Sequence, residues 1–282
     1  MLRVSHLIAR DAQQPLWHRL PGLRLALAAL FLTVLSACST VVRVGGPPEQ
    51  PLPIAQAEQG YTRVLQAHVN TQGEVNFAAL RADNSASGLR ALERYVQAIA
   101  NTPLNVAPTP QARLAHMINA YNALSMYNVI ASGIPASHAG FAKVQFFLLR
   151  KFDIAGEPTS LYAFENDTIR KLGEPRIHFA LNCSAVSCPV LPRMPFTADN
   201  LEQELERETR SFFSKESNLR IDHIKRTVWF NEILKFYTED FVPSPAPNLI
   251  AYAQRYSAQP IPTDYQVAFT PYDWTVANSQ RK

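Results

Sequence analysis

The chain has 282 residues, and its 27 Lys and Arg against 23 Asp and Glu give a formal net charge of +4 at pH 7. Most of this excess lies in the first 37 residues, where four arginines oppose Asp11 for a net charge of +3. The remaining chain has a net charge of about +1. A nucleic-acid-binding function is therefore not expected, because it requires a clustered basic surface.

The first element is an apolar run in the stretch GLRLALAALFLTVLSACST, which begins at Gly22. The run follows Arg24 and has the length of a signal-peptide core, shorter than a membrane span. It ends at LSAC, Leu35 to Cys38, which resembles the bacterial lipobox, where the cysteine is lipidated and begins the mature protein. The alternative is an ordinary signal peptide or a short anchor with an incidental cysteine. We predict a signal peptide over residues 1–37 and lipidation at Cys38.

The residue after this cysteine is Ser39 rather than an aspartate, a pattern that resembles lipoproteins sorted to the bacterial outer membrane. We therefore expect a chain held by three acyl chains, with the protein facing the periplasm. Residues 38–54 include the Gly/Pro-rich stretch VGGPPEQPLP, which predicts a tether. Residues 55–282 then have the size of a single globular domain.

Helical signals dominate the first half of this domain. The stretch from Ser87 to Asn101 carries apolar residues at helical spacing. Thr109 and Pro110 are typical of an N-cap and a first helical residue, and predict a long helix through Val129. Another helix is indicated by SLYAFENDTIRK, with Thr159 or Ser160 as its cap and Gly173 as its end.

Strand-like runs rich in β-branched and aromatic residues follow from the middle of the chain onward. Helices are also expected near 199–213 and 232–241, before a closing segment YQVAFTPYDW. We predict an α+β fold, mainly helical and packed on a small antiparallel sheet. The four predicted strands are KVQFFLL (143–149), RIHFALN (176–182), LRIDH (219–223) and RTVWF (226–230).

The order of several motifs resembles the domain of unknown function 547 family. They are INAYNAL, FDIAG, SLYAFENDTIRK, RIHFALNCSAVSCPVL, WFNEILKFYTEDF and YDW. The family has no established general activity; its bacterial members are often exported and some are lipoproteins, so the resemblance implies an exported protein. Plant members are intracellular and have been discussed as interaction partners. The family usually has a histidine where this chain has Asn166, so an essential role for that histidine is not expected here.

The segment IHFALNCSAVSCPVL places two cysteines after the predicted strand that contains His178. Cys183 and Cys188 could form a disulfide, as is common in exported proteins. Cys183 could instead be a nucleophile, with His178 as its base, Glu165 as the residue that orients the base, and Asn119 or Asn122 as donors. A zinc site of His178 with both cysteines, and a simple buried turn, are the remaining readings.

Other polar residues lie within apolar segments. His116, Asn119 and Asn122 recur at intervals of three and form a strip that indicates either a structural network or a polar pocket. Glu165 and Arg170 share one predicted helix, where an ion pair is the simplest interpretation and an acid or base role would need an apolar pocket.

Two functional hypotheses remain. The first is an exported envelope lipoprotein with a binding or scaffold role, whose polar pocket lies around His178 and Cys183 and includes Asn122, Arg170 and Cys188. Its partner would be an envelope protein or a ligand derived from peptidoglycan or lipid. The second is a thiol-dependent hydrolase or acyl-transferase with Cys183 as nucleophile. Motifs for nucleotide binding, serine hydrolases and metalloproteases do not occur, so no cofactor or metal is expected.

Overall fold

The computed structural model describes residues 39–45 and 50–280. The predicted signal peptide and Cys38 lie outside the described residues. No helix in the described part of the chain combines the length and the apolar character needed to cross a bilayer.

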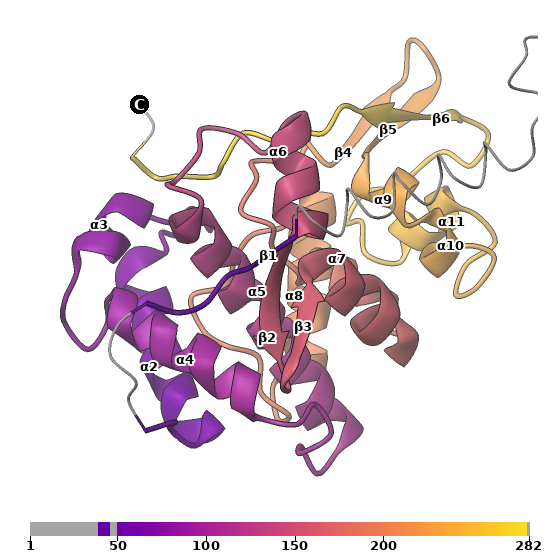
Figure 1. Ribbon diagram of the computed structural model, residues 1–282. Coiled ribbons are helices and arrows are strands. Elements are labelled where there is room, and N and C mark those ends of the chain that lie inside the picture. Colours follow the sequence, from indigo (N-terminus) through magenta and orange to yellow (C-terminus); the bar gives the residue numbers. More distant parts are fainter. Residues whose placement is uncertain (1–38, 46–49, 281–282) are drawn as a thin grey trace, which may run out of the picture. The chain divides into compact units, whose positions relative to one another are not determined.

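A group of helices forms the first half of the fold, around one long central helix (Figure 1). In the central helix, α5, the residues from Leu114 to Ile130 are almost continuously buried, so it is apolar on all sides rather than on one face. Thr109 caps it by accepting a hydrogen bond from the Ala112 N–H, as the sequence predicts. The four helices are α2 (Ile54–His68), α3 (Phe77–Ala82), α4 (Leu89–Asn101) and α5 (Pro110–Ala131).

Three short strands form the first sheet beside these helices. They are β1 (Thr40–Val41), β2 (Arg150–Ile154) and β3 (Glu157–Ser160), in the order β1-β2-β3. Strand β1 runs parallel to β2, and β2 and β3 form an antiparallel hairpin. Because β1 precedes the Gly/Pro-rich segment, that segment connects β1 to α2 within the fold.

The middle of the chain consists of short and irregular helical turns. Ser160 caps the first turn of the SLYAFENDTIRK segment, and Gly173 ends the last turn with a φ of +74°, a conformation that favours glycine. This segment begins as an α-helix but widens into a π-helical turn at Phe164. The elements are α6 (Phe141–Val144), η2 (Gln145–Leu149), α7 (Leu161–Ala163), η3 (Phe164–Ile169), η4 (Arg170–Leu172) and η5 (Pro175–Phe179).

Two of the four predicted strands are wrong. KVQFFLL forms α6 and the π-helical turn η2, and RIHFALN forms the 3₁₀ turn η5 followed by irregular chain. Short apolar runs do not distinguish strands from buried helical turns by their pattern alone. The stretch from Ile177 to Asn182 is buried at every position, so the alternation of faces expected for His178, Ala180 and Asn182 does not occur.

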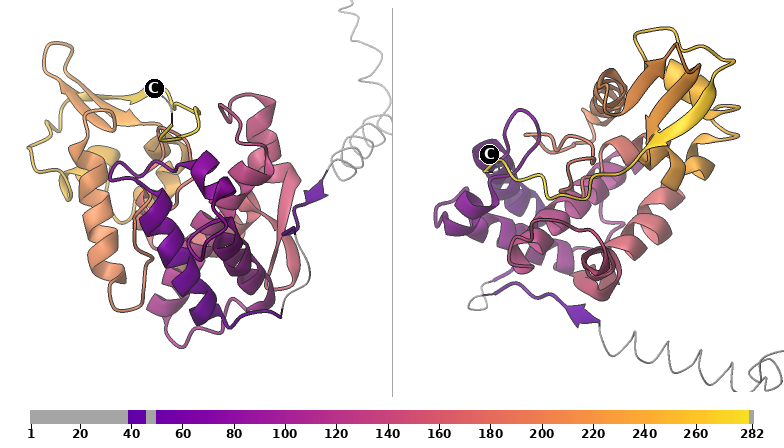
Figure 2. Two further views of the ribbon diagram at one scale, coloured as in Figure 1. Left: turned by 90° about the vertical axis from the view of Figure 1, so that its left-hand side faces the viewer. Right: turned by 90° about the horizontal axis from the view of Figure 1, so that it is seen from above.

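The C-terminal part contains the second sheet, which is separate from the first sheet and lies in another region of the fold (Figure 2). Its strands are β4 (Leu219–Asp222), β5 (Thr227–Asn231) and β6 (Gln266–Thr270); β4 and β5 are antiparallel, as predicted from sequence, and β6 is parallel to β5. Phe179 joins an aromatic cluster here with Phe212, Phe213 and Phe241. The helices are α8 (Leu201–Ser214), α9 (Ile233–Phe236), α10 (Thr238–Phe241) and α11 (Leu249–Gln254).

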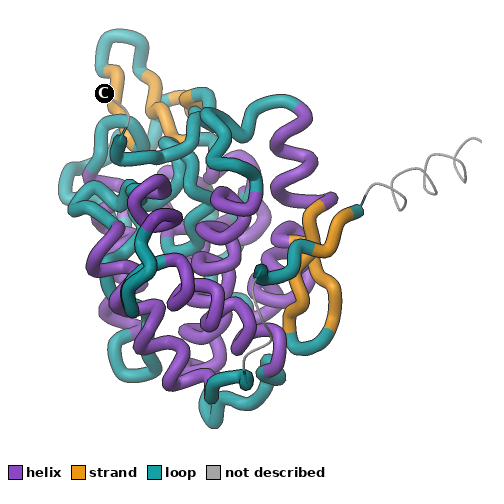
Figure 3. The backbone as a smooth tube through the Cα atoms, turned by 60° about the vertical axis from the view of Figure 1, so that its left-hand side comes forward, coloured by secondary structure: helices purple, strands orange, loops and turns teal. Residues whose placement is uncertain are grey.

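The architecture is therefore α+β and mainly helical, in agreement with the sequence-based prediction (Figure 3). The strands form two small mixed sheets instead of one antiparallel sheet.

Candidate functional site

A narrow cleft lies where the middle segment meets the C-terminal part. Its inner part encloses about 50 Å³ and opens beside a wider hollow of about 260 Å³, with Phe147, Glu165, Tyr237 and Trp274 lining both. The walls are rich in aromatic side chains, which are common in sites that bind small molecules. Besides Phe147, the aromatic residues of the inner part are Tyr121, Phe236, Tyr237, Tyr272 and Trp274.

Glu165 is the one carboxylate that lines both parts of the cleft. Only 5% of its surface is exposed. The Tyr121 hydroxyl donates a hydrogen bond of 2.9 Å to its Oε2, and His178 Nδ1 lies 4.0 Å from its Oε1. Among the described residues, no lysine or arginine forms an ion pair with it. The Tyr237 hydroxyl is a second hydrogen-bond partner, so Glu165 is a buried carboxylate whose partners are two phenols and an imidazole.

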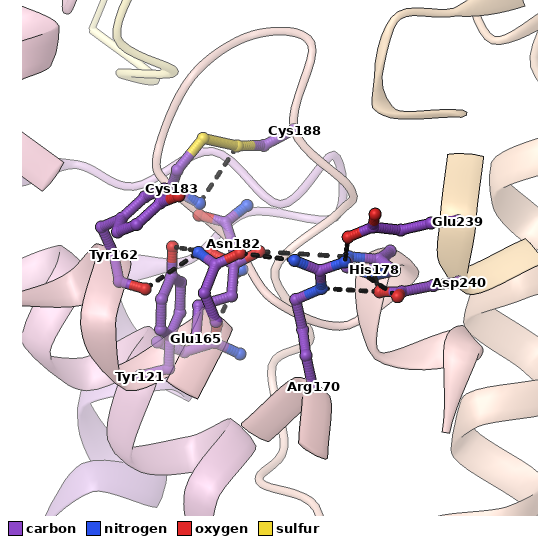
Figure 4. A network of polar contacts seen from close by, with 12 residues as sticks. Tyr121, Tyr162, Glu165, Arg170, His178, Asn182, Cys183, Cys188, Glu239 and Asp240 are labelled. Atoms are coloured by element: carbon purple, nitrogen blue, oxygen red, sulfur yellow. Dashed lines mark hydrogen bonds and ion pairs between the residues drawn. A yellow bond between two sulfur atoms is a disulfide. The ribbon is translucent and has the colours of Figure 1, made fainter. Parts of the chain in front are cut away.

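His178 is held on its other side by Asp240. Its Nε2 lies 2.6 Å from the Asp240 Oδ2 (Figure 4). Its ring stacks on Tyr237 with centroids 3.9 Å apart. Phe241 meets the same ring edge-on at 5.4 Å. A histidine fixed in this way has one nitrogen engaged by Asp240 and directs the other toward Glu165.

Arg170 completes the far side of this network. Its Nε and Nη2 donate to both oxygens of Asp240 at 2.7 and 2.8 Å, and Nη2 also donates to Glu239 at 2.6 Å. Partial burial of Asp240 opposes its ionisation, but the hydrogen bonds from His178 and Arg170 outweigh this effect and hold its pKa below the usual value. Arg170 therefore neutralises Asp240 and not Glu165. Asn166 accepts a hydrogen bond from the Arg170 Nη1.

Cys183 and Cys188 form a disulfide in the wall of the inner cleft. The Tyr272 hydroxyl lies 3.1 Å from Cys188 Sγ and 3.5 Å from Cys183 Sγ. Burial raises the pKa of Tyr272, so its hydroxyl stays protonated and can donate. Of the four readings of this segment, the structure contains the disulfide, and in this form neither sulfur is a thiolate.

The two asparagines of α5 serve as structural braces. Asn119 exchanges hydrogen bonds with the backbone of Phe196 and donates to Glu58, and it does not line the cleft. Asn122 donates to the Ala180 carbonyl and accepts from the Asn182 N–H, so it supports the segment that leads into Cys183. The polar strip on α5 is accordingly a network within the core at these two positions.

The structure brings Glu165, His178, Cys183 and Cys188 into one cleft, with Arg170 adjoining it through Asp240. Nowhere in the described ranges do three or more metal-binding side chains gather. Sequence reasoning missed Asp240, because it lies 62 positions from His178. It also missed the aromatic wall. Tyr237 lies in the motif KFY, and Tyr272 and Trp274 lie in YDW near the end of the sequence.

Comparison with known proteins gives one match. Residues 107–213 match the family model described as "Protein of unknown function, DUF547". No curated protein and no solved structure matches the chain significantly. The chain thus resembles the domain of unknown function 547 family over the segment from α5 to α8, which contains Glu165, His178 and the disulfide.

Proposed function

We propose that this protein is an exported, lipid-anchored binding protein of the bacterial envelope whose cleft binds an organic cation, such as a substituted ammonium group. The apolar segment and the LSAC motif support export and lipidation at Cys38. The observation that carries the binding proposal is Glu165, a buried carboxylate without an arginine or lysine partner among the described residues, at the junction of two aromatic-walled spaces.

The physical argument begins with the cost of burying a charge. An ionised carboxylate in an apolar site is unfavourable unless a cation or several hydrogen bonds compensate it. Tyr121 and Tyr237 supply hydrogen bonds and His178 lies 4.0 Å away, but no lysine or arginine among the described residues balances the charge, because Arg170 is engaged by Asp240 instead. A ligand cation in the cleft would balance the buried negative charge of Glu165.

The aromatic walls favour the same ligand class. Cations are attracted to the faces of tryptophan and tyrosine rings, and ammonium ligands are commonly bound in aromatic cages. The Lys143 ammonium lies 4.5 Å from the centre of the Trp274 ring, so one face of this ring already contacts a cation, and a ligand ammonium group would displace Lys143 or use another aromatic face. The inner space of about 50 Å³ admits only a small group, and the hollow of about 260 Å³ has room for the rest of a ligand.

The test is a titration with choline and with 3,3-dimethylbutan-1-ol, a neutral molecule of nearly the same shape. The fluorescence of Trp274, with Trp229 as a constant background, reports occupancy. We expect choline to bind at least about tenfold more tightly than the neutral analogue, since tenfold corresponds to only about 1.4 kcal/mol. Equal binding, or no binding of choline at millimolar concentration, would refute the proposal.

A matched pair of variants locates the effect. Glu165→Gln keeps the size of the side chain and removes its charge, so the preference for choline should disappear. Glu239→Gln removes a charge of the same kind from a side chain that is 77% exposed and outside the cleft. Its binding of choline should match that of the unmodified protein.

The thiol-dependent hydrolase or acyl-transferase is the second candidate. One observation favours it: His178 and both cysteines line the same inner cleft. This function would require prior reduction of the disulfide, since only a thiolate is nucleophilic. After reduction, alkylation of Cys183 with iodoacetamide should have an apparent pKa well below ~8.5 and slow in His178→Ala. Unchanged reactivity in that variant would eliminate His178 as the base.

A further inference from the structure

The outer rim of the cleft exposes large apolar side chains. Phe141 is 66% exposed, Leu148 45% and Tyr162 51%. Leu148 and Tyr162 line the wider hollow directly, and Phe141 begins the helix that supplies Lys143 and Val144 to it. These three side chains, here called the apolar rim, come from α6, η2 and α7.

The start of β1 lies beside this rim. Strand β1 is parallel to β2, with Thr40 opposite Arg150 and Val41 opposite Lys151. In a parallel pair, the chains that enter the two strands lie at the same edge of the sheet. The chain that enters β2 is η2, which ends at Leu149. The residue before Thr40 is therefore next to the segment that carries Leu148.

The first described strand is close in sequence to the predicted anchor and close in space to the rim. Cys38 precedes Thr40 by two residues in the sequence. Paired strands lie about 4.8 Å apart, and Leu148 is two residues before Arg150. These limits keep the Cα of Thr40 within about 12 Å of the Cα of Leu148. The Gly/Pro-rich segment adds no length here, because it follows β1.

We infer that the apolar rim lies on the membrane that holds the Cys38 anchor, so that the cleft takes its ammonium group from a phospholipid head group at that surface. This inference rests on the proposed function for the lipid anchor and for the nature of the ligand. An amphipathic rim in the interface buries apolar area among the head groups. The neighbouring Lys143 and Lys151 supply positive charge that favours an anionic lipid surface, whereas Arg150 donates to the buried Asn128.

The first experiment measures contact with the membrane in the lipidated protein reconstituted in phosphatidylcholine vesicles. Trp229→Phe and Trp274→Phe remove the tryptophans after residue 37, and Leu148→Trp then places one probe on the rim. Brominated acyl chains in the vesicles should quench this probe at least twofold more than the control.

The control is Ile224→Trp in the same background. Ile224 is 95% exposed, in the turn between β4 and β5. That turn adjoins the Gln266 end of β6, about 20 Å of extended chain from Tyr272 in the cleft. Ile224 is also flanked by His223, Lys225 and Arg226, so this turn is the rival membrane-contact surface. Quenching at Ile224 and not at Leu148, or equal quenching, would overturn the inference.

Hydrogen–deuterium exchange of the unsubstituted lipidated protein gives the same comparison if a tryptophan variant does not fold. Vesicles, compared with detergent, should slow exchange in residues 141–150 and leave residues 219–227 unchanged. The opposite pattern would overturn the inference.

A second experiment tests the source of the ligand. Dihexanoyl-phosphatidylcholine below its micellar concentration should bind at least tenfold more tightly than phosphocholine, because its chains also contact the rim. Equal binding of the two would assign the cleft to a free ligand and refute the lipid source.

These outcomes separate the inference from the proposed function. If choline binds but Leu148→Trp is not quenched, the inference falls and the proposed function stands. If choline does not bind, the proposed function falls together with the head-group part of the inference.

Discussion

The Nε2 of His178 and the Oδ2 of Asp240 lie 2.6 Å apart, although 62 positions separate the two residues in the chain. This contact joins η5 to α10, and Arg170 on η4 binds the same carboxylate. The orientation of His178 in the cleft thus depends on α10, which is distant in sequence, and on the nearby η4.

Asp240→Asn should destabilise the protein by about 1–3 kcal/mol, because Arg170 and His178 lose the charge that they bind. The pKa of Asp240 is lowered in the folded state from an ordinary value of 3.8. The stability that the ionised Asp240 contributes to the fold is therefore present above about pH 4 and is lost as the pH falls further. Urea unfolding at pH 7 and pH 3 measures both effects.

The control for this prediction is Glu239→Gln, which removes a carboxylate from the same arginine. Glu239 is largely exposed, and exposed ion pairs contribute roughly 0–1 kcal/mol. If Glu239→Gln were as destabilising as Asp240→Asn at pH 7, the claim that Asp240 stabilises the fold more than Glu239 would be wrong.

Sequence signals predicted some of the local features of this fold. Thr109 followed by Pro110 located the start of α5, and Ser160 with Gly173 located the limits of the SLYAFENDTIRK segment. Caps and stops act on neighbouring residues, so the sequence contains the whole signal. The contact between His178 and Asp240 depends on packing between distant segments, and no local pattern contains it.

The stretch RIHFALN shows how pattern reasoning fails. Its alternation predicted a strand, but Glu174 accepts from the Arg176 N–H and Pro175 occupies the first helical position, so a 3₁₀ turn forms. The proline was the available signal. The disulfide that follows was one of four interpretations of the Cys183–Cys188 segment, because the sequence does not give the distance between the two sulfurs.

The disulfide should stabilise the fold by about 2 kcal/mol, the value expected from chain entropy for so short a loop. The variant Cys183→Ser/Cys188→Ser should unfold at a correspondingly lower urea concentration. In the unmodified protein, neither cysteine should react with iodoacetamide before reduction, as mass spectrometry can show. Alkylation of Cys183 without a reductant would contradict this prediction.

His138 should make stability depend on pH. It is buried against Phe146, with ring centroids 4.1 Å apart, and burial lowers its pKa from 6.5 to about 4. The unfolded chain binds a proton that the folded chain excludes, so stability is complete above pH 6.5 and falls toward pH 4 by about 3 kcal/mol. Urea unfolding between pH 7 and pH 4 should be less pH-dependent in His138→Gln.

The exposed His223 provides the matched control for His138. His223→Gln should retain the full pH dependence of the unmodified protein. If both substitutions reduced the pH dependence of the free energy of unfolding equally, His138 would not be responsible for that dependence.

Asn122→Ala should destabilise the fold by about 2–4 kcal/mol, because it leaves the Ala180 carbonyl and the Asn182 N–H buried without their partner. Asn101→Ala, at the exposed end of α4, should change stability by less than about 0.5 kcal/mol. Thermal unfolding of both variants provides the comparison. Equal effects would show that Asn122 does not brace the segment before Cys183.

The most direct test of the central claim is a crystal structure of the protein soaked with (2-bromoethyl)trimethylammonium, whose bromine can be located by anomalous scattering. We expect the bromine in the wider hollow, and the ammonium group beside Glu165 and over an aromatic ring, within about 6 Å of the ring centre. Soaked crystals of Glu165→Gln should show no bromine in the cleft. A bromine peak elsewhere, or an equal peak in Glu165→Gln, would contradict the assignment of this cleft to an organic cation.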